Sequence, residues 1–249
     1  MTSGIKNVFI ERVTPKIAYL IGAYLGDGYI TSTRASKWFG LQSIDLDFAK
    51  TIVDYAADDV CATTPPTVIN RVIRNKPRVF YQARINCTDF CDWLLKITKD
   101  KTIVPDCIPL ANCEITKNFC EGFLDSEGWI AMSKQPRQQN GNHAFQGGFG
   151  CTNRSILLTV AKMLQLLGVK MGNLRVAKMT DGRKDCYSFC LNIRSLLSAK
   201  IYFRIKRKRD RLHEFSDTKR HCDRYRDCMS GSLLRDKRQS DLQGNLQPT

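Results

Sequence analysis

Two acidic residues, Asp27 and Glu127, lie one hundred positions apart and end two segments of similar design. The first segment is 20–28 (LIGAYLGDG) and the second is 120–128 (CEGFLDSEG), so each acid follows an apolar stretch and directly precedes a glycine. Glycine readily adopts the left-handed conformation that ends a helix, which places each acid at a helix C-terminus. There the acid faces the negative end of the helix macrodipole, an unfavourable position without compensation.

Each segment also carries small residues four positions apart, Gly22 and Gly26 in the first and Gly122 and Ser126 in the second. Small side chains at this spacing form a smooth helix face along which two backbones can approach closely. Two such helices packed side by side bring their terminal acids together, and like charges at short range raise one pKa unless a cation lies between them. A divalent ion such as Mg²⁺ takes carboxylate and carbonyl oxygens, so it is the natural compensator. A single copy favours a buried helix with a chance stop, but two copies in register favour a site.

The two segments resemble the LAGLIDADG motif of homing endonucleases, in the single-chain form that carries two copies. The resemblance implies that the last acid of each motif, Asp27 or Glu127, is catalytic and binds metal, with the carbonyl groups of Gly26 and Ser126 as further ligands. It implies two or more Mg²⁺ ions shared between the halves. Mn²⁺ is expected to substitute for Mg²⁺, and Ca²⁺ is expected to support binding without cleavage.

Four further polar residues are placed at the site by the same resemblance. Gln42 and Asn153 precede the helix that follows the second strand of each half, where the family often carries an amide that orders water. Lys101 follows the first half and Lys208 follows the second, where the family places a basic residue near each phosphate. A neighbouring lysine competes for each of these two roles, and simple phosphate attraction or solvent exposure explains such lysines equally well.

Hydrophobic periodicity and turn residues predict an α+β fold of two pseudo-symmetric halves, each reading helix, two strands, helix, two strands, helix. The expected helices are 15–27, 45–60, 88–98, 115–127, 154–168 and one from about 194, and the expected strands are 29–34, 37–43, 67–75, 78–86, 129–133, 144–152, 171–179 and 185–193. This order resembles the αββαββα unit of the family, in which the antiparallel sheets form a DNA-binding saddle and the motif helices join the halves. The expected domains are 14–105, 106–212 and a basic, flexible tail at 213–249.

Alternation along the strands places polar and basic side chains on one face of each sheet. If Phe39 and Leu41 point to the core, for example, Trp38 and Gln42 point away. A solvated outer face gives the same pattern, so alternation alone leaves DNA binding and simple exposure open. The residues expected on DNA are Thr31, Thr33, Arg34, Trp38, Arg71, Arg74, Arg78, Gln82, Arg84, Lys134, Gln146, Arg175, Lys178, Ser188 and Asn192.

Composition agrees with a globular protein that binds a polyanion. The chain has 249 residues, 43% of them hydrophobic, and a net charge of +15, which would otherwise only repel itself. Double-stranded DNA is the expected partner, intron RNA is a further candidate, and the single-chain form implies a monomer. The odd count of 11 cysteines favours free thiols in an intracellular, reducing compartment. No signal-like segment and no apolar run near the ~20 residues of a membrane span is seen, so no membrane partner is expected.

These features predict a site-specific DNA endonuclease, borne by an intron, that makes a metal-dependent double-strand break with short 3′ overhangs at a long target. Metal ions held between the two acids would lower the pKa of bound water and stabilise the leaving oxygen. Two alternatives stay open. The first is an RNA-binding intron maturase on the same fold, which needs no cleavage. The second is a non-cleaving DNA-binding regulator, in which such acids are usually lost.

Overall fold

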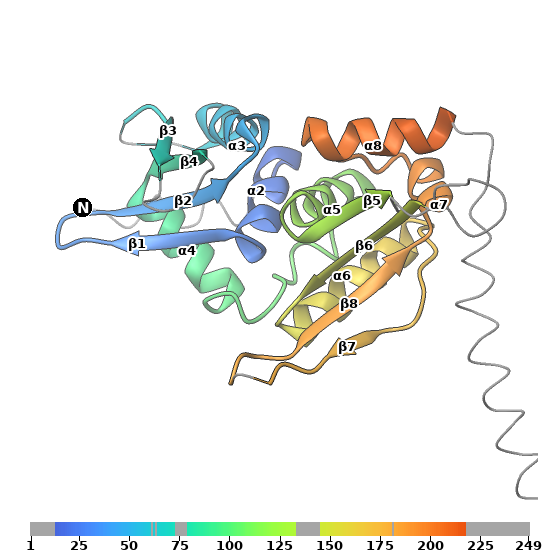
Figure 1. The fold of residues 1–249 in the computed structure, drawn as a ribbon. Coiled ribbons are helices and arrows are strands. Elements are labelled where there is room, and N and C mark those ends of the chain that lie inside the picture. Colours follow the sequence, from blue (N-terminus) through green and yellow to red (C-terminus); the bar gives the residue numbers. More distant parts are fainter. Residues whose placement is uncertain are drawn as a thin grey trace, which may run out of the picture.

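The computed structural model describes residues 13–60, 62, 64–72, 79–132, 145–180 and 182–217. These residues form two halves with the same order of elements (Figure 1). The first half comprises α2 (Pro15–Leu25), β1 (Gly28–Ser32), β2 (Lys37–Ser43), α3 (Leu46–Asp59), β3 (Thr67–Val72), β4 (Val79–Asn86) and α4 (Thr88–Thr98). The second half comprises α5 (Cys113–Glu127), β5 (Gly128–Met132), β6 (Phe145–Cys151), α6 (Arg154–Leu166), β7 (Arg175–Ala177), β8 (Cys186–Leu191) and α7 (Ile193–Ser198), and α8 (Lys206–Asp217) follows it. The predicted α+β class and the repeated αββαββα order are confirmed.

Each half contains one four-stranded antiparallel sheet, with the order β1-β2-β4-β3 in the first and β5-β6-β8-β7 in the second. The two sheets share their register. Gly28 of β1 pairs with Leu41 of β2, and Gly128 of β5 pairs with Phe149 of β6. Leu41 is therefore equivalent to Phe149, and this equivalence relates the remaining residues of the two halves.

Short polar side chains begin several helices, which explains where these helices start. Thr14, Asn112, Asn153 and Asn192 are the N-cap residues of α2, α5, α6 and α7, and each side-chain oxygen accepts a hydrogen bond from a backbone N–H in the first turn. Gly168 follows α6 with a φ of 88°, the left-handed conformation expected of a glycine at a helix end. These local signals set the helix boundaries close to the predicted ones.

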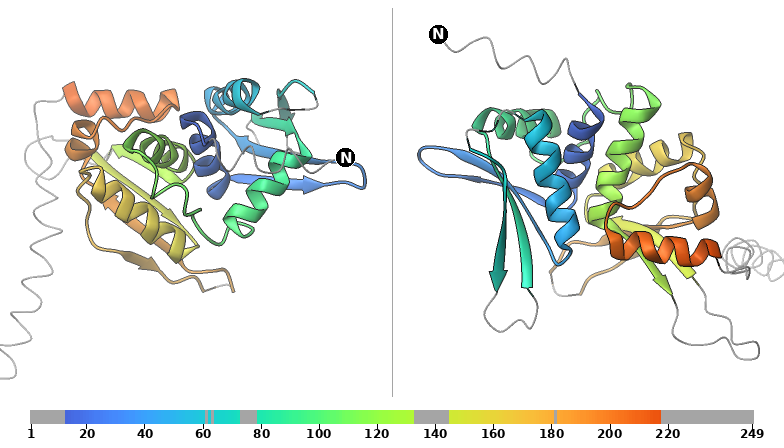
Figure 2. Two further views of the ribbon diagram at one scale, coloured as in Figure 1. Left: turned by 180° about the vertical axis from the view of Figure 1, so that it is seen from behind. Right: turned by 90° about the horizontal axis from the view of Figure 1, so that it is seen from above.

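The motif helices α2 and α5 pack side by side between the two halves (Figures 1 and 2). A Cβ atom on Gly22 would lie only 2.1 Å from the carbonyl oxygen of Phe119, and one on Gly122 would lie 2.1 Å from the carbonyl oxygen of Tyr19. Both values are far below a van der Waals contact, so these positions accept no side chain. The small-residue face predicted from the sequence thus brings the two backbones into direct contact.

The core lies between the inner face of each sheet and the helices that pack on it, chiefly α3 and α4 in the first half and α6 in the second. Phe39 and Leu41 of β2 and Phe149 of β6 are fully buried on these inner faces. Gln42 is exposed and Trp38 is half-buried, so the second strand faces the core as predicted. Alternation therefore assigned the two faces of this strand correctly.

Two parts of the second half differ from the prediction. The expected hairpin at 171–179 and 185–193 is shorter in the structure. It consists of β7, whose three residues are all exposed, and β8, which is six residues long. The last helix is divided into α7 and α8 because Lys200 adopts a left-handed φ of 53° and residues 201–203 belong to no helix. A lysine at such a position gives no sequence signal, unlike a glycine.

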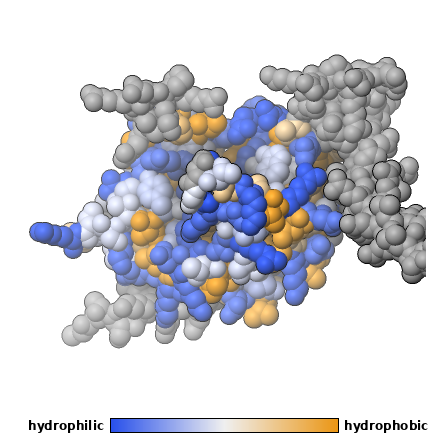
Figure 3. Space-filling view, turned by 60° about the horizontal axis from the view of Figure 1, so that its bottom comes forward, coloured by the Kyte–Doolittle hydropathy of each residue, from blue (hydrophilic) through white to orange (hydrophobic). Residues whose placement is uncertain are grey.

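In the face shown in Figure 3, hydrophilic residues cover most of the coloured surface, and apolar residues lie between them in small groups. Single exposed apolar side chains such as Leu110 and Leu166 are normal on such surfaces. A search of the described residues finds no helix with the length and apolar character needed to cross a lipid bilayer.

Candidate active site between the two motif helices

Glu127 is the last residue of α5, as predicted, whereas Asp27 lies two residues after Leu25, the last residue of α2. Gly28 and Gly128 begin strands and do not adopt the expected left-handed conformation. The C-terminal ends of the two helices are adjacent. A Cβ atom on Gly26 would lie 2.3 Å from the Cβ atom of Ser126 and 3.1 Å from the Cγ atom of Glu127. The Ser126 hydroxyl donates a hydrogen bond of 3.3 Å to the carbonyl oxygen of Ala23 across the helix interface. The structure thus brings both predicted acids into one site.

The two acids influence each other electrostatically. Burial raises the pKa of Glu127 to about 7, and the charge of Asp27 adds to this rise while Lys101 and Lys208 oppose it. Burial also raises the pKa of Asp27, again against the two lysines. Burial alone raises the pKa of Asp27, whereas the negative charge of the other acid adds to the effect of burial on Glu127. A further cation between the two carboxylates would favour the charged form of both.

Lys101 and Lys208 each donate hydrogen bonds to backbone carbonyl groups at the end of one motif helix. The Nζ atom of Lys101 lies 2.6 Å from the carbonyl oxygen of Gly26 and 2.9 Å from that of Gly28. The Nζ atom of Lys208 lies 2.5 Å and 3.2 Å from two carbonyl oxygens in the last turn of α5. Each lysine compensates the negative end of one helix dipole. The carbonyl of Gly26, predicted as a metal ligand, accepts from Lys101 in this structure.

The backbone that carries Lys101 has an unusual conformation. Lys99, Asp100 and Lys101 all adopt left-handed φ angles, of 46°, 52° and 61°. Such angles are costly for residues other than glycine and persist only where surrounding contacts impose them. The hydroxyl of Thr98 supplies one such contact, since it accepts from the Lys101 backbone N–H at 3.3 Å. The segment after α4 is therefore shaped by specific contacts.

Gln42 and Asn153, the two predicted amides, have different surroundings. Gln42 is exposed near the end of β2. Asn153 is engaged at both ends of its side chain: its oxygen caps α6, and its Nδ2 donates to the carbonyl oxygens of Lys101 at 3.2 Å and Thr102 at 3.3 Å. By sheet register the residue equivalent to Asn153 is Asp45, which precedes α3, and Gln42 is equivalent to a glycine. The two amides are thus not at equivalent positions.

Asp45 belongs to the surroundings of the site, although the sequence indicates only that it begins the expected helix 45–60. Its carboxylate accepts two hydrogen bonds from the guanidinium of Arg207, at 3.0 and 2.8 Å. The neighbouring Asp47 carboxylate accepts from the backbone N–H of Lys206. These contacts fix the start of α8 against the start of α3. The partners lie about 160 positions apart, so no periodic signal in the sequence could reveal them.

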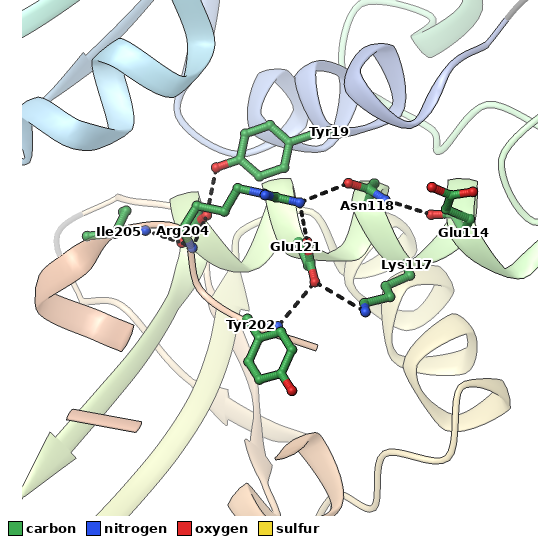
Figure 4. Close-up of polar contacts among 9 residues, drawn as sticks. Tyr19, Glu114, Lys117, Asn118, Glu121, Tyr202, Arg204 and Ile205 are labelled. Carbon is green, nitrogen blue, oxygen red and sulfur yellow. Dashed lines mark hydrogen bonds and ion pairs between the residues drawn. The ribbon is translucent and has the colours of Figure 1, made fainter. Parts of the chain in front are cut away.

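Two buried acids of α5 hold the segment that leads to α8 (Figure 4). Asp125 and Glu121 are only 1% and 3% exposed. The Asp125 carboxylate accepts from the Tyr19 hydroxyl at 2.6 Å and from the Arg204 backbone N–H at 2.9 Å. The Glu121 carboxylate accepts from the Arg204 guanidinium at 3.0 Å and from the Tyr202 backbone N–H at 3.2 Å. Burial nevertheless raises the pKa of Asp125 to about 6. This network anchors the chain just before Lys208.

The outer face of the first sheet carries aromatic, amide and basic side chains together. The Arg84 guanidinium lies 4.7 Å from the centroid of the Trp38 ring, and the Tyr29 ring meets Trp38 edge-on at 5.5 Å. A Cβ atom on Gly40 would lie 2.5 Å from Trp38, so the glycine leaves room for these rings. Gln82 donates to the Tyr29 hydroxyl and is only 1% exposed. Trp38 and Arg84 thus form part of an outward platform, whereas Gln82 lies beneath it.

The second sheet repeats part of this arrangement. Trp129, equivalent to Tyr29, lies over Gly148, where a Cβ atom would approach its ring to 2.4 Å. Gln146 is exposed on the same outer face and donates to the sulfur of Cys190 at 3.5 Å. Ser188 lies next to Gly150 on this face. Both sheets therefore present an aromatic ring beside small and polar residues.

The remaining residues predicted to contact DNA are placed as follows. Thr31 is half-buried in β1, Thr33 and Arg34 are exposed in the turn after it, and Arg175 and Lys178 are exposed around β7. Lys178 forms an ion pair of 2.9 Å with Asp185, and Asn192 caps α7. The side chain of Arg71 and the whole of Arg74, Arg78 and Lys134 lie outside the described residues.

Replacing Glu127 by glutamine is expected to change how stability depends on pH. The folded-state pKa of Glu127 is raised from an ordinary 4.5 to about 7. Its protonated form therefore stabilises the fold fully below pH 4.5, and this stabilisation is lost as the pH rises through about 7. Glu127→Gln should therefore match the wild type at pH 4.5 and be more stable at pH 8, by about 1–2 kcal/mol after allowance for solvent. Urea unfolding at several pH values with a chelator measures this. A difference that stays constant with pH would contradict it.

Comparison with known proteins gives likeness in fold but no match in sequence. No protein-family model and no curated protein matches the chain. Among solved structures, the chain is similar to I-DmoI in complex with DNA and Mn, at 15% identity and a TM-score of 0.49, over 74% of this chain and 93% of that chain. It is similar to the homing endonuclease I-WcaI bound to its DNA recognition sequence, at 15% identity and a TM-score of 0.49, over 83% and 92%. It is also similar to the N-terminal LAGLIDADG domain of DUF199/WhiA, at 12% identity and a TM-score of 0.48, over 74% and 78%.

The fold and the site define an α+β protein whose two halves meet at a pair of acid-tipped helices. In its paired motifs the chain resembles the single-chain LAGLIDADG proteins. At these identities and TM-scores the likeness concerns the fold alone.

Proposed function

We propose that the chain is a site-specific DNA endonuclease of the LAGLIDADG type, which cuts both strands of a duplex in a metal-dependent reaction. The observation that carries this proposal is the pair of acids, Asp27 and Glu127, at two adjacent helix ends with a lysine beside each end. Like charges in one partly buried place oppose folding, and such arrangements are concentrated at functional sites. Intron homing, monomeric action in a reducing intracellular compartment and short 3′ overhangs belong to the same proposal.

The donor set fits a hard divalent cation such as Mg²⁺. Asp27 and Glu127 would hold it, and water would complete its coordination, as Mg²⁺ prefers. Among the described residues no group of three or more His, Cys, Asp or Glu side chains is placed to bind a metal, which argues against a zinc-type cage there. When bound, the ion would lower the pKa of an attacking water and stabilise the leaving oxygen.

The chain's own residues supply the rest of the chemistry. Lys101 and Lys208 place positive charge next to the acids, where it attracts a phosphate and stabilises negative charge that develops on it. Trp38 and Arg84 on the outer face of the first sheet, and Gln146 and Ser188 on that of the second, offer stacking and hydrogen bonds to DNA. The net charge of +15 favours a partner as acidic as DNA.

Incubation with a library of randomised duplexes and Mg²⁺, followed by sequencing of new ends, tests this function. Recognition that sums many contacts of about 1–3 kcal/mol tolerates mismatches, so partial sites in the library should be cut. Recovered ends should share a sequence and carry short 3′ overhangs. In a parallel reaction with Ca²⁺ as the sole divalent ion, the protein should bind duplex without cutting it. A library left intact by excess protein with Mg²⁺ would rule the function out. In that case, selective retention of RNA in a separate binding assay would support the maturase alternative.

A further inference from the structure

The two lysines at the site are held in place by contacts that cross between the halves. Lys101 lies in the segment directly after α4, the last helix of the first half. Its Nζ atom donates hydrogen bonds to carbonyl groups just after the first motif helix. The backbone of that segment is bound by the second half: Nδ2 of Asn153 donates to the carbonyl oxygens of Lys101 and Thr102 at 3.2 and 3.3 Å. The second half therefore holds the lysine that serves the first motif.

The reverse contact holds Lys208. This lysine lies in α8, which follows the second half, and its Nζ atom binds the end of the second motif helix. The residue before it, Arg207, forms a bidentate ion pair with Asp45, with hydrogen bonds of 3.0 and 2.8 Å. The Asp45 side chain is only 12% exposed. Asp45 precedes α3 in the first half. The first half therefore holds the lysine that serves the second motif.

Asp45 and Asn153 occupy equivalent positions, since the shared register of the two sheets places both directly before the helix that follows the second strand. Their chemistry is opposite. Asp45 accepts hydrogen bonds from a cation, whereas Asn153 donates hydrogen bonds to two carbonyl groups. The same crossed contact is thus built twice from unlike residues, with unlike partners.

We propose that Asp45 and Asn153 are positioning residues, each of which fixes the active-site lysine of the opposite half. The proposal deepens the proposed function and rests on it for the role of the lysines in cleavage. The crossed geometry itself is independent of that role. Each lysine is in place only while the opposite half is docked, so loss of one contact should impair one strand-cutting centre and leave the other in place.

Lysine reactivity measures the positioning without DNA and without metal. The purified full-length chain is treated briefly with a low concentration of the N-hydroxysuccinimide ester of acetic acid, and peptide mass spectrometry gives the acetylation rate of each lysine. A lysine released from its carbonyl partners reacts faster. The test variants are Asn153→Ser, which keeps a helix-capping oxygen but loses the amide donor, and Asp45→Asn, which keeps the shape but loses the charge.

The expected result is a crossed pattern. Asn153→Ser should raise the rate at Lys101 by about three- to tenfold, the factor for one or two lost hydrogen bonds, and leave Lys208 unchanged. Asp45→Asn should raise the rate at Lys208 by about two- to fivefold, the factor for a partly exposed ion pair, and leave Lys101 unchanged. If Asp45→Asn fails to fold, Arg207→Gln breaks the same pair from the other side.

Two matched variants control for general loosening. Asn112→Ser changes another capping asparagine, at the start of α5. Asp58→Asn breaks another ion pair, of 2.7 Å with Lys16. Neither should change the reactivity of Lys101 or Lys208. The proposal is overturned if a test variant exposes the lysine of its own half, exposes both lysines equally, or changes neither.

The outcome separates this proposal from the proposed function. A crossed labelling pattern in a protein that cuts no duplex supports the positioning and rejects the nuclease. Cleavage by a protein without the crossed pattern supports the nuclease and rejects the positioning. If both proposals hold, Asn153→Ser and Asp45→Asn should accumulate nicked plasmid, whereas the wild type yields linear product. The strand nicked by one variant should be the strand left intact by the other.

Discussion

Asp27→Asn is expected to abolish cleavage of both DNA strands while the fold and DNA binding are kept. The adjacent helix ends make Asp27 and Glu127 parts of one site, so loss of either carboxylate leaves too few acidic ligands for a divalent ion. The cleavage rate should fall by about 10³-fold or more, because the several kcal/mol that such an ion supplies correspond to that factor. Conversion of supercoiled plasmid carrying a selected target into nicked and linear forms measures it.

Binding and folding controls make this result specific. Asp54→Asn removes an exposed acid of α3 away from the site and should cleave like the wild type. Fluorescence anisotropy with Ca²⁺ should show that Asp27→Asn binds the target at least as tightly as the wild type, because one negative charge near the phosphates is gone. Residual cleavage within about tenfold of the wild-type rate would exclude Asp27 as a residue on which the reaction depends.

Gly22→Ala is expected to destabilise the protein strongly. A Cβ atom there would lie 2.1 Å from the carbonyl oxygen of Phe119, a backbone atom that cannot turn away as a flexible side chain could. In an unpacked helix the same change stabilises by about 1 kcal/mol. Here we expect a loss of about 3 kcal/mol in the free energy of unfolding, because the two motif helices must separate. Urea denaturation measures the loss.

Gly172→Ala is the matched control for this prediction. A Cβ atom on Gly172 would meet nothing closer than Cys190, at 3.9 Å, which is an ordinary contact. The change in stability should stay within about 1 kcal/mol, since it acts mainly on the unfolded chain. A Gly22→Ala protein as stable as the wild type would mean that the helices do not pack in this way.

Much of the fold could be predicted because its signals are local. A capping threonine such as Thr14 marks a helix start, and alternation along β2 identifies Phe39 and Leu41 as inward residues. The acids Asp27 and Glu127 were found because two similar segments repeat at a fixed spacing. Each of these patterns reflects the geometry of a single element or of an internal repeat, which a sequence displays directly.

The parts that could not be predicted depend on contacts between distant residues. Asp45 meets Arg207, and Asp125 meets the backbone of Arg204, because the tertiary fold brings them together. No periodicity records such pairs. The resemblance implies that Asn153 is an amide that orders water at the site, and no pattern in the sequence indicates that both ends of its side chain bind backbone groups. The end of α7 was missed because Lys200 adopts a conformation that usually marks glycine.

The backbone contact between α2 and α5 fixes the distance between the two helices. Because main-chain atoms touch at Gly22 and Gly122 with no side chain between them, the separation of the two helix axes depends on peptide geometry. Substitutions among the surrounding apolar residues can therefore accumulate over evolution without altering the interval between the two acids. In the proposed nuclease, that interval sets the stagger between the two cuts, so the stagger should stay constant even as the recognised sequence drifts.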